Sequence, residues 1–214
     1  RNKSRVLVLT TRGITTRFRH FLEDIMRLLP HAKKAPKLEA KECLDVANEI
    51  AELRGCSNIL LLEARKRQDL YLWLAASPFG PTLKFHVANV HNMDELGFPG
   101  NNLMFSRPLL TFDAAFDESS HMRLAKELLT QTFAAPDGHR RTKPFVDHII
   151  AFYVCDGRIW MRHYQVVDAA LDDKTQNKDV ESTIVEIGPR LVMTPIKCFA
   201  SSFAGATLWE NDSY

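Results

Sequence analysis

Hydrophobic and polar positions alternate along this chain with two periods, one typical of strands and one typical of helices. The apolar stretch within residues 5–10 predicts a short buried strand. The apolar positions of residues 17–29 recur every three or four residues and predict a helix, which Thr15 or Thr16 can cap. The basic residues 30–40 that follow predict a loop.

The first half continues with a second helix and three strands. The helix is predicted over about residues 41–54, with a buried face that can include Leu53 and with Gly55 as a left-handed stop. Alternating or continuous apolar runs then predict the strands, at residues 58–64, 70–75 and 82–90.

The second half repeats the order of the first. Gly80-Pro81 opens a strand in the first half, and Gly188-Pro189 opens one in the second. Two matching units, each small for a core of its own, predict an α/β (α+β) fold of two pseudo-symmetric halves packed on each other. The predicted elements are a strand at 108–112, a helix at 120–134, and strands at 147–155, 158–167, 183–187 and 191–199.

Composition agrees with a globular chain: 45% of the residues are hydrophobic and 25% are charged, which excludes wholesale disorder. The longest apolar run, residues 149–155, is far shorter than the roughly 18 residues that span a bilayer. No secretory leader opens the sequence. We therefore expect neither a membrane segment nor secretion.

The net charge of +2 conceals a strong asymmetry. Residues 1–37 contain ten Lys or Arg against two acidic residues, a net charge of +8, whereas the rest of the chain sums to −6. A concentrated basic segment on a nearly neutral body indicates a polyanionic partner, and nucleic acid is the leading candidate. The alternative is a solvated surface that happens to be rich in basic residues.

Basic residues form three clusters: around the first helix start, in the turn at residues 65–67, and in the loop at residues 140–143. Free backbone N–H groups at a helix start also attract phosphate. The turn joins two apolar strands, so its cations are expected in solvent, although a merely soluble turn would look the same. With two further arginines, the predicted RNA-binding set is Arg12, Arg17, Arg19, Arg65, Lys66, Arg67, Arg107, Arg140, Arg141, Lys143 and Arg190.

Aromatic side chains interleave only weakly with these cations. Tyr71, Trp73, Trp160 and Tyr164 all lie in predicted strands. Such residues are usually core residues, and the alternative is a platform on which bases stack.

No pattern of catalytic residues emerges. The chain has no phosphate-binding or dinucleotide-binding glycine loop, and its four cysteines form no Cys-x-x-Cys pair, so we expect no zinc. Asp113, Asp117 and Glu118 could hold a divalent metal, but they flank a helix start, where capping is the usual role. Asp147 and His148 are adjacent in a predicted strand and should point to opposite faces. We therefore expect no enzyme activity, no cofactor and no metal.

Seven strings of the sequence resemble those of the Brix-domain family of ribosome-assembly proteins. They cover almost the whole chain, in order, and include Gly-Pro-Arg-Leu at residues 188–191 and Pro-Phe-Val-Asp-His at residues 144–148. The strings are residues 11–14, 64–73, 77–81, 106–113, 143–148, 186–191 and 203–211.

The resemblance implies a single Brix domain over residues 1–214, with two halves that each resemble an anticodon-binding domain. The halves would span about 1–105 and 106–214, and the polar stretch at 168–182 is expected to be a flexible insertion. The resemblance implies a non-enzymatic nucleolar factor for the large (60S) ribosomal subunit. It would bind precursor rRNA, an Ebp2-type assembly factor and other pre-ribosomal proteins, with no membrane and no small-molecule substrate. The alternative is a protein-interaction scaffold whose core does not itself bind RNA.

Overall fold

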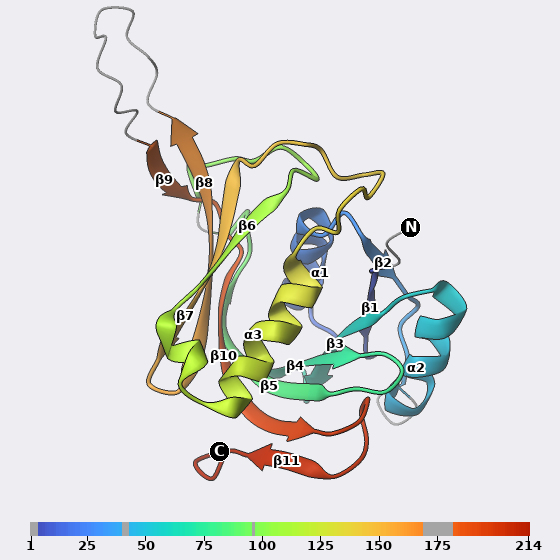
Figure 1. The fold of residues 1–214 in the computed structure, drawn as a ribbon. Helices are drawn as coiled ribbons and strands as arrows, with labels where there is room; N and C mark the ends of the chain where they lie inside the picture. The colour runs from blue at the N-terminus through green and yellow to red at the C-terminus, as the bar shows by residue number, and fades with distance from the viewer. Residues whose placement is uncertain (1–3, 40–42, 96, 169–181) are drawn as a thin grey trace, which may run out of the picture.

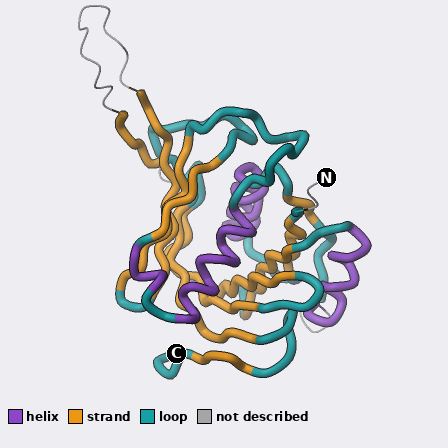
Figure 2. The backbone as a smooth tube through the Cα atoms, in the orientation of Figure 1, coloured by secondary structure: helices purple, strands orange, loops and turns teal. Residues whose placement is uncertain are grey.

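A single curved sheet wraps around two helices in the computed structural model (Figures 1 and 2), which describes residues 4–39, 43–95, 97–168 and 182–214. None of the described helices is long and apolar enough to cross a membrane. The elements are β1 (Val6–Thr10), α1 (Thr16–Leu28), β2 (Ala32–Lys34), α2 (Cys43–Arg54), β3 (Asn58–Arg65), β4 (Asp69–Ala76), β5 (Thr82–His91), β6 (Pro108–Phe112), the 3-10 helix η1 (Ala114–Asp117), α3 (Ser120–Phe133), β7 (His148–Cys155), β8 (Arg158–Asp168), β9 (Ser182–Glu186), β10 (Arg190–Phe199) and β11 (Thr207–Glu210).

The order of the strands confirms the predicted pseudo-symmetric α/β arrangement. The sheet runs β2-β1-β3-β4-β5-β10-β8-β7-β6, with β11 beside β10 and β9 beside β8. In the first half β1 is parallel to β3, and β3, β4 and β5 are antiparallel; β6, β7, β8 and β10 repeat this pattern. The antiparallel pair β5–β10 joins the two sets of four strands. The domain limits at 1–214 and the division near residue 105 stay predictions.

Helix α1 begins and ends where the sequence predicts. Thr15 is its N-cap in an extended conformation, and the Thr15 hydroxyl accepts a hydrogen bond from the Phe18 N–H. The apolar face of the helix, which includes Phe21 and Ile25, is buried against the concave side of the sheet. Pro30 follows the last turn, where a helix cannot readily continue.

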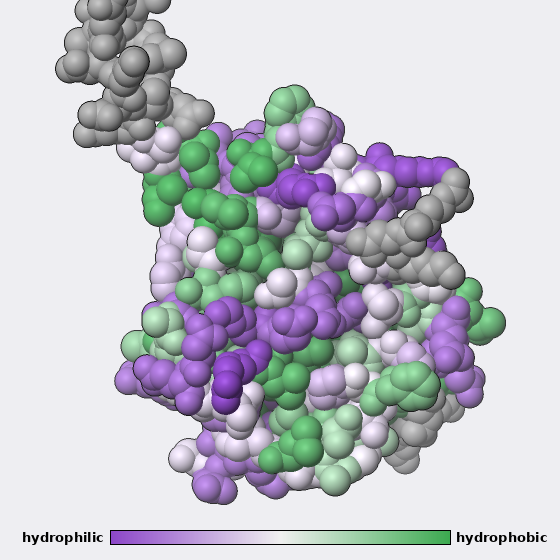
Figure 3. Space-filling model, in the orientation of Figure 1, coloured by the Kyte–Doolittle hydropathy of each residue, from purple (hydrophilic) through white to green (hydrophobic). Residues whose placement is uncertain are grey.

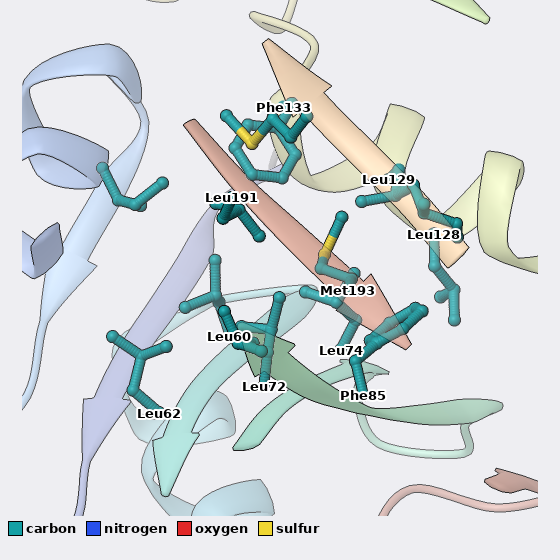
Figure 4. Packing of buried hydrophobic residues seen from close by; sticks show 14 of the residues in the cluster. Leu60, Leu62, Leu72, Leu74, Phe85, Leu128, Leu129, Phe133, Leu191 and Met193 are labelled. Carbon is teal, nitrogen blue, oxygen red and sulfur yellow. The ribbon is translucent and has the colours of Figure 1, made fainter. Parts of the chain in front are cut away.

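One hydrophobic core fills the concave side and is shared by both halves. Figure 4 shows side chains from β3, β4 and β5 of the first half meeting side chains from β10 and α3 of the second. These side chains belong to one cluster of buried apolar residues, so neither half buries its apolar surface alone. The labelled members are Leu60, Leu62, Leu72, Leu74, Phe85, Leu128, Leu129, Phe133, Leu191 and Met193.

Helix α2 covers the opposite, convex side of the first half. Ala47 and Ala51 of α2 pack in a second cluster with Leu9, Leu61 and other side chains of β1, β3 and β4. The expectation that Leu53 joins the buried face is wrong, because its side chain lies off that face and is 87% exposed.

The sequence pattern did not predict two short strands, β2 and β11. The predicted loop at residues 30–40 contains β2, which pairs in parallel with β1 and closes that edge of the sheet. Strand β11 pairs with β10 near the C-terminus. Three or four residues are too few to show a period, so tertiary pairing decides their structure. Of the predicted insertion at 168–182, residues 169–181 lie outside the described part of the chain.

The two halves differ in the elements that follow their first helix. Strand β2 and helix α2 lie between α1 and β3, whereas the residues between α3 and β7 form neither a helix nor a strand. In the second half, the outer edge of β6 therefore has no partner strand among the described residues, and no described helix covers the convex face. The second half presents an open edge and an open face.

We predict that Gly80→Ala destabilises the fold more than Gly157→Ala. Both glycines have positive φ, +90° and +69°, so alanine costs about 1–2 kcal/mol at either position. A Cβ at Gly80 would lie 2.4 Å from the Ser201 carbonyl carbon, whereas a Cβ at Gly157 meets nothing within 4 Å. The clash should cost about 1–3 kcal/mol more. Urea unfolding of both variants measures the difference, and equal losses would contradict the close packing at Gly80.

Candidate nucleic-acid interface

The loop after β1 and the turn between β3 and β4 lie side by side. The Thr11 N–H donates to the Leu62 carbonyl and the Ala64 N–H donates to the Thr11 hydroxyl, both at 3.0 Å. Because β1 and β3 are parallel, their C-terminal ends meet at one edge of the sheet. The structure thus gathers the helix-start cluster: Arg12, Arg17, Arg19, Arg65, Lys66 and Arg67.

The turn itself holds two cations in a conformation that glycine or asparagine usually occupies. Lys66 and Arg67 have φ values of +49° and +59°, as in the tight turns that match the twist of a hairpin. Left-handed backbone costs a side-chain-bearing residue roughly 1–2 kcal/mol. The turn therefore places two exposed cations at its tip despite this cost.

The second cluster lies at the other end of α1. The Lys143 N–H donates to the Phe105 carbonyl at 2.9 Å, and the Arg107 N–H donates to the Phe145 carbonyl at 2.8 Å, so these loops are joined. The helix-end cluster is Arg107, Arg140, Arg141 and Lys143. With 13 residues at 1.5 Å each, α1 separates the two clusters by about 20 Å. Arg190 belongs to neither cluster and lies over the Phe98 ring.

Ion pairs divide the predicted RNA-binding set. Five of its eleven members have a carboxylate partner, which the charge pattern did not reveal. Ion pairs on a protein surface contribute little to stability. The pairs are Arg12 with Glu39 (2.5 Å), Arg17 with Glu95 (3.2 Å), Arg65 with Glu63 (2.7 Å), Arg107 with Asp137 (2.8 Å) and Arg190 with Glu186 (3.5 Å).

The other six members are exposed and have no ion-pair partner within the described residues. They occur in both clusters, so each end of α1 keeps unneutralised positive charge. They are Arg19, Lys66, Arg67, Arg140, Arg141 and Lys143.

All three cations of the turn are exposed, as predicted, but Arg65 has partners that its two neighbours lack among the described residues. Its Nε–H donates to Glu63, and its guanidinium lies 5.0 Å from the centre of the Tyr71 ring. This hydrogen bond to the Glu63 carboxylate raises the pKa of Arg65. The other Glu63 oxygen accepts from the Trp73 indole N–H at 2.9 Å. The spacing of Glu63 and Arg65, two residues apart on one strand face, is the signal that could have indicated the pair.

The aromatic side chains divide between core and surface. Trp73 is buried, and the Tyr71 hydroxyl accepts a hydrogen bond from the Tyr214 hydroxyl at 3.0 Å. Trp160 and Tyr164 are partly exposed on the uncovered convex face of the second half. The first pair is thus structural, as the usual role of strand aromatics suggests.

We call that uncovered surface the open sheet face. Strand register places its members on one side, because Ile149 opposes Tyr164 and Tyr153 opposes Trp160. The Arg162 guanidinium lies 5.4 Å from the Trp160 ring centre. Hydrophobic surface gathers at the upper left of Figure 3, where β6 and β8 run. The members are Leu109, Ile149, Tyr153, Trp160, Tyr164 and Ile184; Leu109, Tyr153 and Ile184 are exposed.

The remaining candidate for catalysis is a buried network. Asp147 and His148 were predicted to point apart, but Asp147 Oδ1 lies 2.7 Å from His148 Nδ1. Strand β7 begins at His148, so the alternation of a strand does not govern Asp147. The Ser106 hydroxyl donates to the same carboxylate. Ser106 and His148 are at most 1% exposed, so no substrate reaches them, and we assign the network a structural role.

Of the acidic residues before α3, Asp117 forms an ion pair with Lys126. Asp113 occupies the N-cap position of η1, yet its side chain makes no capping hydrogen bond, contrary to expectation. Both Asp117 carboxylate oxygens accept from the Lys126 ammonium at 2.9 Å. Among the described residues, no three His, Cys, Asp or Glu side chains are grouped as metal ligands.

The doubled α/β sheet is the fold that the sequence resemblance implied, and comparison with known proteins agrees with that fold. The chain belongs to the Brix family, whose domain matches residues 11–197. It is 47% identical over 214 residues to the ribosome biogenesis protein BRX1 of Saccharomyces cerevisiae and 48% identical over 212 residues to brx1 of Schizosaccharomyces pombe. The human BRX1 homolog is 45% identical over 214 residues. The chain is thus a homologue of the BRX1 ribosome biogenesis proteins.

The matches cover nearly all of this chain but only part of each relative. These matches cover 99–100% of this chain but 74%, 70% and 58% of the Saccharomyces, Schizosaccharomyces and human proteins. Among solved structures, a probable ribosomal biogenesis protein from Aeropyrum pernix K1 matches with a TM-score of 0.56 and 16% identity. That match covers 89% of this chain and 96% of the other, and it supports the fold.

A buried histidine links the helix-end cluster to α3. His31 is 2% exposed, its Nε2 lies 3.2 Å from the Thr132 carbonyl oxygen, and its ring faces that of His139. Burial lowers the pKa of His31 to about 4. The imidazole is therefore neutral at pH 7 and donates to the carbonyl.

We predict that His31→Gln reduces the acid sensitivity of the fold. Because the folded pKa of about 4 lies below the unfolded value of 6.5, the stability from neutral His31 is complete above pH 6.5 and is lost as the pH falls toward 4. The wild-type loss from this group should reach about 2 kcal/mol by pH 5. Urea unfolding between pH 7 and pH 5 measures it, and an unchanged pH dependence in the variant would rule out this role.

Proposed function

We propose that this chain is a non-enzymatic assembly factor of the large (60S) ribosomal subunit that binds precursor rRNA in the nucleolus. The observation that supports RNA binding is the set of six exposed, unpaired cations at the two ends of α1. Family membership supports the place in ribosome biogenesis. The chain would act by holding a folded transcript, without changing it chemically.

The spacing of the clusters suits a folded RNA. About 20 Å between them corresponds to roughly six base pairs, at about 3.4 Å per nucleotide step. Contacts with phosphates give affinity without sequence reading, so folded shape would select the site. Each phosphate contact contributes about 0.7 to the salt slope on single strands and about 0.9 on duplex DNA.

We predict that Lys66→Glu combined with Arg67→Glu weakens binding of structured rRNA by about ten- to a hundredfold and lowers the salt slope by about 1.4 to 1.8. A matched control reverses Arg123 and Arg158, two exposed cations outside both clusters. Gel shifts across a salt series measure both variants. Equal weakening by the two double variants would show that only overall charge matters and would exclude a specific contact at the turn.

For the second half, we propose docking of a partner assembly factor, of the Ebp2 type, on the open edge and open sheet face. The first half supplies the template: β2 pairs with the edge of β1, and α2 covers the convex face. A partner strand beside β6, followed by a helix over the open sheet face, would complete the second half in the same way.

Charge specifies the docking helix further. The open sheet face and its margin carry Arg158, Arg162 and Arg190, and the Glu186 carboxylate lies 3.6 Å from Arg162 and 3.5 Å from Arg190. An amphipathic helix with an apolar stripe and acidic flanks would fit this surface. Other pre-ribosomal proteins would associate with this chain through the same partner.

We predict that Tyr153→Glu or Ile184→Glu weakens partner binding by about thirtyfold or more, because exposed apolar side chains at the centre of an interface are typical hot spots. Leu53→Glu, which removes a still more exposed apolar side chain from α2, is the control and should have no effect. Titration calorimetry with the partner protein measures each variant. Full partner binding by both face variants would contradict the docking site.

The open sheet face also favours a second function, a protein-interaction scaffold whose core does not bind RNA. A gel shift with this chain alone separates the two. Retention of structured rRNA at moderate salt supports the first function, and absence of retention supports the second.

A further inference from the structure

A pocket lies between the C-terminal end of α1 and the loop that follows β5. Its volume is about 220 Å³, and it is lined by Arg27, Leu28, Met93, Asn101, Asn102 and Met104. A liquid water takes up about 30 Å³, and pockets for drug-sized molecules begin at roughly 300 Å³. The size therefore suits one planar ring or one amino-acid side chain.

The loop that forms one wall is fixed at three points. The Met93 N–H donates to the Asp24 carboxylate at 2.9 Å, and the Asn101 N–H donates to the Gln165 side-chain oxygen at 2.8 Å. The Leu103 N–H donates to the Asp147 carboxylate at 2.7 Å. The anchors come from α1, β8 and the residue before β7, so the pocket is preformed rather than assembled on binding.

The lining combines apolar side chains with hydrogen-bonding groups that have no partner among the described residues. Met93 and Met104 offer flexible thioethers that pack well against rings, and the Arg27 guanidinium can stack on one. Asn101 Oδ1 accepts from the Asn102 N–H, which leaves the Asn101 amide N–H groups without a partner among the described residues. The Asn102 side-chain oxygen likewise has none there. The two asparagines thus bring hydrogen-bond donors and an acceptor to a lining that also holds apolar side chains.

The cations of the helix-end cluster border this pocket. Met104 is followed by Phe105, whose carbonyl accepts the Lys143 N–H at 2.9 Å. Lys143 belongs to the loop between α3 and β7. Earlier in that loop, the His139 ring contacts the ring of His31, which lies just beyond α1. Arg140 and Arg141 lie between these two attachments. The loop after β5 and the loop between α3 and β7 both lie at the top of Figure 2.

We propose that this pocket takes a single unpaired RNA base, with the neighbouring phosphates held by Arg140, Arg141 and Lys143. The proposal rests on the proposed RNA-binding function and adds a base contact to it. A base offers a planar face for the methionines and arginine and polar edges for the asparagine amides. An apolar partner side chain would bury those amides without hydrogen bonds, so the lining favours a base.

Methyl NMR of the full chain tests the site directly. Methionines labelled with ¹³C at the methyl group are titrated with a single-stranded RNA octamer of mixed sequence and with an abasic octamer of the same length. We expect the signals of Met93 and Met104 to shift with the base-bearing octamer only, and those of the buried Met161 and Met193 to stay. Equal shifts with both octamers, or none at Met93 and Met104, would overturn the base pocket.

A variant provides the second measurement. Asn102→Ala should weaken binding of the base-bearing octamer roughly three- to tenfold, the effect of one lost hydrogen bond, and leave binding of the abasic octamer unchanged. Thermal unfolding checks that the variant folds. If neither octamer binds wild-type protein, the RNA-binding function itself fails, and the base pocket with it. If Met93 and Met104 respond only to the partner protein, the pocket takes a protein side chain and the base proposal is wrong.

Discussion

The pairing of β5 with β10 is the interaction on which the rest of the molecule depends. It extends from Thr82 opposite Phe199 to His91 opposite Arg190 and turns two sets of four strands into one sheet. Side chains from both strands, such as Phe85 and Met193, enter one core with the helices of both halves. Each half alone is small for an independent core, so stability, the position of α1 and the spacing of the basic clusters all follow from this pairing.

Equivalent positions of the two halves have diverged in charge. The connection from β1 to α1 carries Arg12 and the first turn of α1 carries Arg17, whereas the connection from β6 to α3 carries Asp113 and Asp117. The turn after β3 is built from cations, whereas the turn after β7 is Asp156-Gly157. In the first half β2 pairs with β1 and α2 covers the convex face, whereas no described strand or helix takes these places in the second half. This divergence is the physical basis for assigning RNA to the basic clusters and a protein partner to the second half.

The sequence predicts what depends on local pattern and misses what depends on distant contacts. Both helices of the concave side and the long strands follow their hydrophobic periods, and the two Gly-Pro pairs mark β5 and β10. The ion pair of Arg107 with Asp137 joins separate loops, so no charge count could reveal it. The sequence pattern did not predict the open sheet face. Hydrophobic periodicity indicates where helices form, but it does not show that a strand face has no helix to cover it. The pocket draws its walls from separate segments and has no signature in any one of them.

The central claim is that RNA contacts the two ends of α1 and that protein contacts the open sheet face. Crosslinking the intact protein to precursor rRNA inside cells, followed by mapping of the joined residues and nucleotides, tests this claim most directly. We predict RNA crosslinks within residues 12–19, 65–67 and 139–143, and protein crosslinks on β6 to β9. RNA crosslinks concentrated at Tyr153, Trp160 and Tyr164, or absent from the two basic clusters, would contradict the account.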